Sequence, residues 1–101
     1  MVKLTVLYGH PDDPAAFEEH YTNTHMPMVP KMPNLLRFET GKVVGTPEGG
    51  ELPYYRIAEL WFESMEQMQQ SLSTPEGQAP PADLPNFATG GVTIFISEVE
   101  E

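Results

Sequence analysis

The sequence has no cysteine among its 101 residues, which excludes disulfide bonds, thiol chemistry and a cysteine-ligated zinc site. It also has no long hydrophobic run, because no stretch approaches the ~20 apolar residues that a membrane-spanning helix needs. Residues 1–11 contain a short apolar run but no small-residue cleavage site typical of a secretion signal. We therefore expect a soluble, cytoplasmic protein that does not cross a membrane.

Basic residues are also scarce. The chain has 5 lysines and arginines against 15 aspartates and glutamates, a formal net charge of −10. Such a charge repels nucleic acid and anionic membranes, and it disfavours a phosphate-rich ligand. The acids cluster in "PDDPAAFEEH", "EGGE" and "SEVEE", runs that are typical of solvated surface. A neutral, apolar or aromatic small molecule is the expected ligand class.

The length predicts one domain over residues 1–101. A chain of this size buries roughly 60 to 70% of its unfolded surface, so a partner subunit would add useful burial. Alternating apolar and β-branched residues predict four strands, and helical spacing after two capping residues predicts two helices. The expected strands are residues 2–8, 35–45, 54–62 and 92–100, with helices from Asp13 to Pro27 and from Ser64 to residue 73.

Proline decides two boundaries in this prediction. Pro27 should end the first helix, because the residue before a proline disfavours the α region. Residues 74–91, "TPEGQAPPADLPNFATGG", are rich in proline and glycine, so we expect a loop or a short broken helix there.

The predicted order is strand, helix, strand, strand, helix, strand. It is typical of an α+β, ferredoxin-like βαββαβ fold, with both helices on one face of a four-stranded antiparallel sheet. The other face then carries a mixture of polar and aromatic side chains: Thr5, Ile57, Glu59, Trp61 and Phe95. Such a mixture suits a ligand pocket, and it also suits a dimer interface.

Tyr21 and His25 are four residues apart, so both lie on one helical face and can point into one site. An alternative is that both simply complete the apolar stripe of the helix, formed by Phe17, Tyr21, Thr24 and His25. His20 and His25, five apart, should not share a face. With no H-x-x-x-H pattern in the chain, we predict no metal site.

Three stretches together resemble the EthD family of the dimeric α/β-barrel superfamily. They are "KLTVLYGHPDDPAAFEEHYTNTHMPMVPKMP", "AELWFESMEQM" and "LPNFATGGVTIFISEV". The most specific element is aromatic-x3-His-x-Pro, here Tyr21, His25 and Pro27. The resemblance implies a homodimer whose two sheets face each other, with a cavity in each protomer between sheet and helices. It implies several activities, since similar proteins include cofactor-free cyclases, a lactone isomerase, decarboxylases and a component of an oxidative ether-degradation system.

Under this resemblance we expect His25 and Tyr21 to be the catalytic residues, near the cavity mouth. A histidine that titrates near neutrality can move a proton to or from a cyclic substrate. Met26, Met28 and Met32 are expected to line or close the entrance, and segment 74–91 to cover it. The predicted substrate-binding residues are Thr5, Glu59, Trp61, Asn86, Phe87 and Phe95.

Three functions remain open at this point. The first is a cofactor-independent enzyme that acts by proton transfer on an apolar aromatic or cyclic molecule. The second is a non-catalytic carrier of such a molecule that accompanies an oxidative system. The third is a haem-binding oxidoreductase, since histidine and methionine are usable axial ligands.

Overall fold

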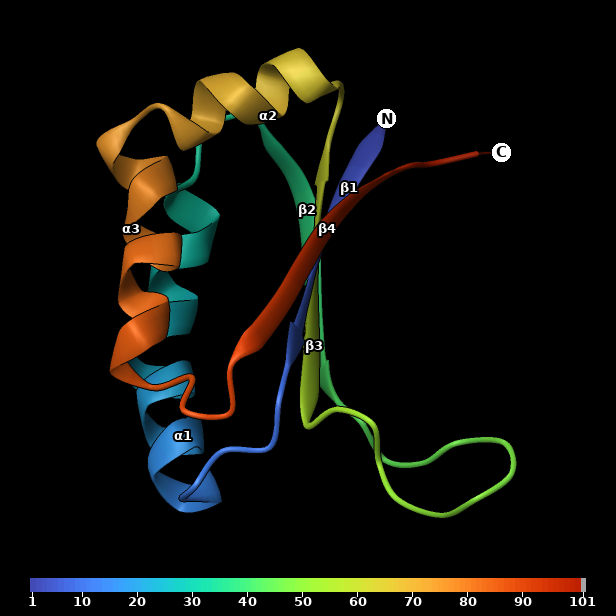
Figure 1. Cartoon of the computed structure of the whole chain (residues 1–101). Coiled ribbons are helices and arrows are strands. Elements are labelled where there is room, and N and C mark those ends of the chain that lie inside the picture. Colours follow the sequence, from blue (N-terminus) through green and yellow to red (C-terminus); the bar gives the residue numbers. More distant parts are fainter. Residues whose placement is uncertain (101) are drawn as a thin grey trace.

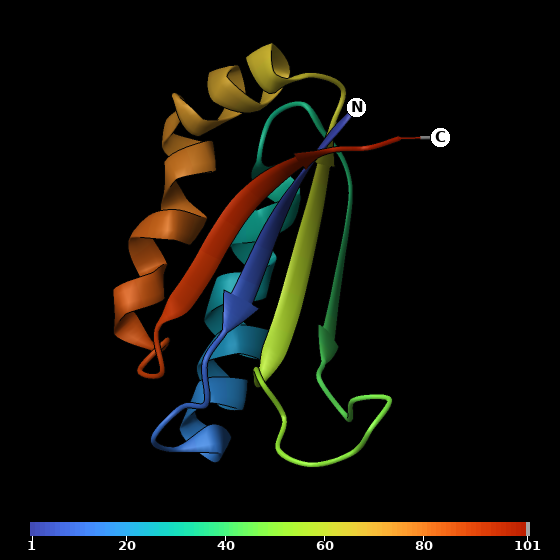
Figure 2. The ribbon, with the colours of Figure 1, turned by 45° about the vertical axis from the view of Figure 1, so that its right-hand side comes forward.

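A computed structural model describes residues 1–100. Its four strands form one sheet in the order β2-β3-β1-β4, with every neighbouring pair antiparallel. The strands are β1 (Val2–Tyr8), β2 (Leu35–Lys42), β3 (Arg56–Phe62) and β4 (Val92–Glu98). All helices lie on one side of the sheet (Figure 1), and the edge strand β4 and the central strands are seen side by side in Figure 2. The predicted ferredoxin-like α+β fold is confirmed.

The sheet has two unlike faces because strand side chains alternate. The inner face, under the helices, carries Val6 and Tyr8 of β1 with Leu60 and Phe62 of β3, all buried. Register places Thr5 opposite both Glu59 and Phe95 on the outer face. The outer face has no covering element within the described chain, and only the 43–55 connection projects beyond it (Figure 1). The predicted division of β1 and β3 into two faces is therefore confirmed.

The first helix begins where the sequence predicts. Asp13 is its N-cap and accepts a hydrogen bond from the Ala16 backbone amide, and Pro14 opens α1 (Pro14–His20). The predicted end at Pro27 is wrong. The chain continues through a π-helical turn, η1 (Tyr21–His25), and a 3-10 helix, η2 (Met26–Lys31), and Met26 itself has α-helical dihedral angles.

The helical run ends at Met32, which is extended and precedes Pro33. Burial explains why it continues that far, since Phe17, Tyr21, His25 and Val29, four residues apart in turn, are all buried. The packing of this stripe outweighs the local preference of a residue before proline. Thr24, which we expected in the stripe, is exposed instead.

The second half of the chain contains two capped helices. Ser64 caps α2 (Met65–Leu72) by accepting from the Gln67 amide, as predicted. Segment 74–91 is not irregular: it forms α3 (Pro75–Asp83) and the short 3-10 helix η3 (Leu84–Asn86). Of the two predicted alternatives, the loop is wrong for residues 75–86 and the short broken helix is the better description, because Thr74 caps the helix and Pro75 occupies its first position, where proline is tolerated.

Close packing fixes α3 against α2. A Cβ atom on Gly77 would lie 1.8 Å from the Ser71 carbonyl oxygen, so only glycine fits at this contact. Within residues 1–100, none of these helices has the length and apolarity that crossing a bilayer requires.

Candidate functional site

An apolar cavity lies between the inner face of the sheet and the helical layer. It offers about 60 Å³ to the centres of water-sized molecules. That volume corresponds to a few water molecules and is less than half of the ~150 Å³ that holds a benzene ring, so a ring-sized ligand would extend through an open side of the cavity. Ile94 of β4 lines the cavity although it is 46% exposed, so the wall formed by this edge strand reaches solvent. Its other lining residues include Val6, Tyr8, Tyr21, His25, Met26, Met32, Leu60, Pro80 and Leu84.

His25 is the basic group in the cavity wall. It is 4% exposed, and its Nδ1 lies 2.9 Å from Oδ2 of Asp83, at the end of α3. A carboxylate only accepts hydrogen bonds, so Nδ1 carries the hydrogen and Nε2 keeps its lone pair. Nε2 has no partner in the described chain, and it is not among the fully buried unpaired atoms, which are Oγ1 of Thr5 and Oγ of Ser71. The ring stacks on Tyr21 at 5.6 Å, as four-residue spacing predicts.

His20 reaches the same carboxylate. Its Nε2 lies 2.9 Å from Oδ1 and 3.0 Å from Oδ2 of Asp83. We expected His20 and His25 to diverge, and that expectation is wrong. The π-helical turn of η1 starts directly after His20, and its wider turn brings residues five apart onto one side. Asn86 completes the cluster by donating from Nδ2 to Oδ1 at 3.0 Å.

Burial and hydrogen bonding set the protonation of this cluster. Burial lowers the pKa of His25 below its ordinary value, and this effect exceeds the opposing one of Asp83. Burial acts to raise the pKa of Asp83, but hydrogen bonds from Asn86, His20 and His25 outweigh it and hold the pKa below its ordinary value. Near neutral pH the pair is therefore a neutral imidazole held by an ionised carboxylate.

Tyr21 is anchored at its hydroxyl. The hydroxyl oxygen lies 2.6 Å from Oγ1 of Thr40, which also accepts from Nη1 of Arg56 at 3.1 Å. The Arg56 guanidinium stands 4.6 Å from the centre of the Tyr21 ring. Burial is the main reason why the pKa of Tyr21 is raised, so the phenol stays protonated at neutral pH.

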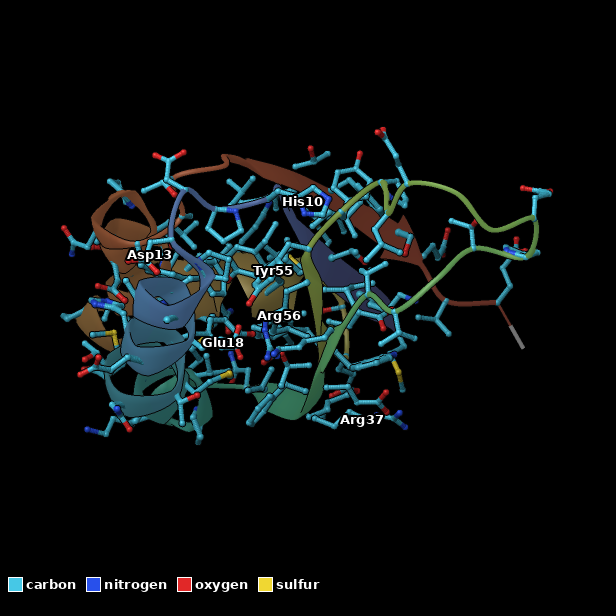
Figure 3. All side chains as sticks on the ribbon, turned by 90° about the horizontal axis from the view of Figure 1, so that it is seen from below. His10, Asp13, Glu18, Arg37, Tyr55 and Arg56 are labelled. Atoms are coloured by element: carbon cyan, nitrogen blue, oxygen red, sulfur yellow. The ribbon has the colours of Figure 1, made fainter. Side chains whose placement is uncertain are left out.

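Arg56 is held in turn by Glu18 of α1. Glu18 accepts from Nη2 of Arg56 at 2.8 Å and from the Tyr55 hydroxyl at 2.9 Å. Figure 3 shows Glu18, Tyr55 and Arg56 together between the helix and the sheet, with Arg37 away from them. This cluster ties α1 to β3 and fixes the guanidinium above Tyr21.

Four of the predicted binding residues lie on the other side of the sheet. Thr5, Glu59, Trp61 and Phe95 are on the outer face, and none of them lines the cavity that contains His25. Glu59 pairs with Lys3 at 2.9 Å, and Trp61 packs under Lys3 and Arg37. The structure does not bring these four residues together with His25 and Tyr21 in one chain, so Glu59 is not placed to share a proton with His25.

Segment 74–91 borders the cavity, but not through the residues we expected. Pro80, Pro81 and Leu84 line it, whereas Asn86 and Phe87 lie at a separate groove beside His20. Phe87 is buried and stacks on His20 at 4.9 Å between ring centres. Of the three methionines expected at the entrance, Met26 and Met32 line the cavity and Met28 does not.

Sequence analysis did not identify Asp83, Thr40 or Arg56. Asp83 lies in the proline-rich segment that we expected to be a loop or a short broken helix. An acidic residue in such a segment is expected on the solvent-exposed surface. Arg56 gave a weak signal, since it is one of only 5 basic residues and lies in a strongly apolar strand. No group of three or more acidic or histidine side chains in the described part of the chain is arranged to hold a metal ion.

Known proteins share both the sequence and the fold. The EthD domain model matches residues 10–91. An uncharacterised 11.0 kDa protein from the thcB-thcC intergenic region of Rhodococcus erythropolis is 43% identical over 99% of this chain and 96% of its own length.

Two solved structures extend the comparison. An EthD family protein of Bacillus halodurans is 39% identical, covers 99% of both chains and gives a TM-score of 0.90. A dimeric protein of ferredoxin-like fold from Bacteroides fragilis is 18% identical, covers 97% of this chain and 95% of its own, and gives a TM-score of 0.67, which supports the fold alone. On the family model and these close relatives, the chain belongs to the EthD family.

Proposed function

We propose that this chain binds a small apolar aromatic or cyclic molecule in the inner cavity and moves a proton on it through His25. The observation that carries the proposal is the position of His25, in the wall of an apolar cavity with Nδ1 held by Asp83 and Nε2 unpaired. A carboxylate that orients a neutral imidazole is the arrangement of a general base and its orienting group. Removal of a proton next to a carbonyl or ring would begin a cyclisation or isomerisation. In a decarboxylation the bond to the carboxyl carbon breaks, and protonated His25 would instead supply a proton to the carbon that loses CO₂.

Tyr21 supports the same role from the adjacent turn. Its ring stacks on His25, and its hydroxyl is fixed by Thr40. An aromatic ligand in the cavity would lie along these rings, with the apolar wall of β1 and β3 opposite. The phenol remains protonated, so Tyr21 orients the ligand rather than accepting its proton.

The cavity also supports a carrier function, because its lining is almost wholly apolar and binding alone needs no base. The two functions differ in what His25 does. The size of the cavity argues against the haem alternative, since about 60 Å³ encloses too little space to bury a porphyrin with its four pyrrole rings.

A base-sensitive probe tests the proposal. 5-Nitrobenzisoxazole loses its carbon-bound proton to a base, the N–O bond breaks, and a coloured phenolate with a nitrile group forms. We expect the protein to accelerate this elimination and His25→Gln to lower the rate by ~10² to 10⁴, the usual contribution of a general base. His10→Gln is the matched control, because His10 bonds only to the Leu52 carbonyl, away from the cavity.

Phenol binding separates enzyme from carrier. Phenol should shift the methyl resonances of Met26 and Met32, which line the cavity, in wild type and in His25→Gln alike. Phenol binding with an elimination rate that His25→Gln does not change would support the carrier function and refute proton transfer. If the protein neither binds phenol nor accelerates the elimination, the cavity is not the functional site.

We also propose that the chain acts as a homodimer through the outer face of the sheet. On this face Phe95 is 47% exposed, and Ile57 and Trp61 are partly exposed, an apolar patch that monomers rarely leave open. Thr5, Glu59, Trp61 and Phe95 then lie at the subunit contact or at a ligand site that the partner completes. A mass of 11.3 kDa by light scattering at micromolar concentration would contradict this proposal.

A further inference from the structure

The carboxylate of Asp83 connects two separate spaces. On one side His25 lines the inner apolar cavity of about 60 Å³. On the other side His20 lines an outer groove of about 280 Å³. The side chain of His20 is 27% exposed, against 6% for His25 and 5% for Asp83. The groove is lined by Asp12, Asp13, Ala16, Phe17, His20, Asn86, Phe87 and Thr89.

Both imidazoles contact the same carboxyl group. Oδ2 of Asp83 lies 2.9 Å from Nδ1 of His25 and 3.0 Å from Nε2 of His20. In the described chain, the second nitrogen of neither ring has a hydrogen-bond partner. One free nitrogen therefore belongs to the ring in the cavity wall, and the other to the ring at the groove.

We propose that Asp83 couples the two imidazoles, so that a proton taken by His25 from a molecule in the cavity is matched by a proton that His20 releases into the outer groove. This coupling rests on the proposed function of His25. It makes His20 and Asp83 positioning residues that act through His25 and do not touch the ligand.

Charge balance is the physical reason for the coupling. Asp83 supplies one negative charge, which compensates one imidazolium in a part-buried site but not two. With His20 protonated and His25 neutral, the three groups carry no net charge. Proton uptake at Nε2 of His25 would make the cluster cationic, and loss of the outer proton from His20 to water restores neutrality. The reverse exchange resets the site when His25 returns its proton to the product.

Other ionisable groups around the cluster do not supply this compensation. Tyr8 of β1 and Tyr21 of η1 face the cavity as neutral phenols, because burial raises the pKa of both. Arg56 of β3 is paired with Glu18 of α1. Asp12 and Asp13 line the open groove beside His20, where solvent screens them.

Proton NMR titration of the full chain tests the coupling. In wild type we expect the resonances of His20 and His25 each to report two steps. In His20→Gln, whose amide can still donate to Asp83, loss of the neighbouring positive charge should raise the His25 midpoint by about one pH unit. His10→Gln should leave it at the wild-type value.

The elimination assay separates failure of the coupling from failure of the proposed function. A protonated His25 is no base, so the acid limb of the rate profile should move upward in His20→Gln by the same amount as the NMR midpoint. If both stay at wild-type values while His25→Gln is inactive, the coupling is refuted and the proposed function stands. If His25→Gln keeps wild-type elimination, the proposed function is refuted whatever the titration shows.

Discussion

The two faces of the sheet differ in how deeply their polar groups are buried and how these groups are paired. On the inner side His25, Asp83 and Tyr21 are buried, and Nδ1 of His25, the Asp83 carboxylate and the Tyr21 hydroxyl each have a partner inside the fold. On the outer face Lys3, Glu59 and Trp61 are only partly covered, with a salt bridge and a cation over an aromatic ring at the surface. The same alternating strands produce both faces, so the difference comes from the helices that cover one of them.

This contrast separates two kinds of contribution. Buried polar groups lose water, so breaking their pairs costs the full desolvation of the remaining partner. When an exposed ion pair is broken, water replaces each partner, so the free energy of unfolding changes little. The inner face should therefore determine the stability of the single chain and its pH response, and the outer face its association.

The largest expected difference is between two neighbouring aromatic residues of β3. Phe62 is fully buried on the inner face, so Phe62→Ala should lower the free energy of unfolding by ~3 to 5 kcal/mol. Trp61→Ala, on the outer face, should cost the chain only about 1 kcal/mol and weaken dimerisation. Urea unfolding at several protein concentrations measures both, and equal losses that do not depend on concentration would contradict the contrast.

The second comparison concerns carboxylates. Asp83→Asn places an amide against two imidazole donors and Asn86, and should cost ~1 to 3 kcal/mol. Glu59→Gln, which removes the outer salt bridge with Lys3, should cost at most ~1 kcal/mol. Thermal melts of the two variants compare these losses of stability. A larger loss in Glu59→Gln would show that the more important polar contact lies on the outer face.

The pH dependence of stability should come from the inner cluster. The pKa of His25 is lowered from its ordinary 6.5 on folding, so the unfolded chain binds more protons just below that pH. Its contribution is complete above pH 6.5 and is lost as pH falls toward the folded pKa. The lowered pKa of Asp83 continues the loss below its ordinary 3.8.

The slope from one such group is at most ~1.4 kcal/mol per pH unit. Melting temperatures of wild type and His25→Gln across the acid range measure it. The His25→Gln curve should be flatter near pH 6, and His10→Gln should run parallel to wild type. Parallel curves for all three proteins would show that His25 is not the source of the pH dependence of stability.

The smallest comparison concerns two hydroxyl groups. Tyr21→Phe removes the bond to Thr40 and should cost ~0.5 to 1.5 kcal/mol. Oγ1 of Thr5 is buried without a partner within the described chain, so Thr5→Val should be neutral or stabilising. Chemical unfolding of both variants decides, and a destabilised Thr5→Val would show that this hydroxyl finds a partner at the subunit contact.

The sequence by itself determined the strands, the capped starts of α1 and α2, and the ferredoxin-like order, because these depend on alternation, helical spacing and side chains a few residues away. It also placed Tyr21 beside His25. The start of α3 has a local signal in the Thr74 cap and Pro75, but only the tertiary structure decided that the helix continues through Pro80 and Pro81, where Gly77 allows close contact with α2.

The same holds for the site. The π-helical turn that directs His20 and His25 to one carboxylate follows from burial of the stripe along α1, and Asp83 comes from a helix 58 residues later than His25. Local propensity carries no information about such a contact. The hydrogen bonds of the candidate site form only when elements distant in the sequence cover the inner face of the sheet.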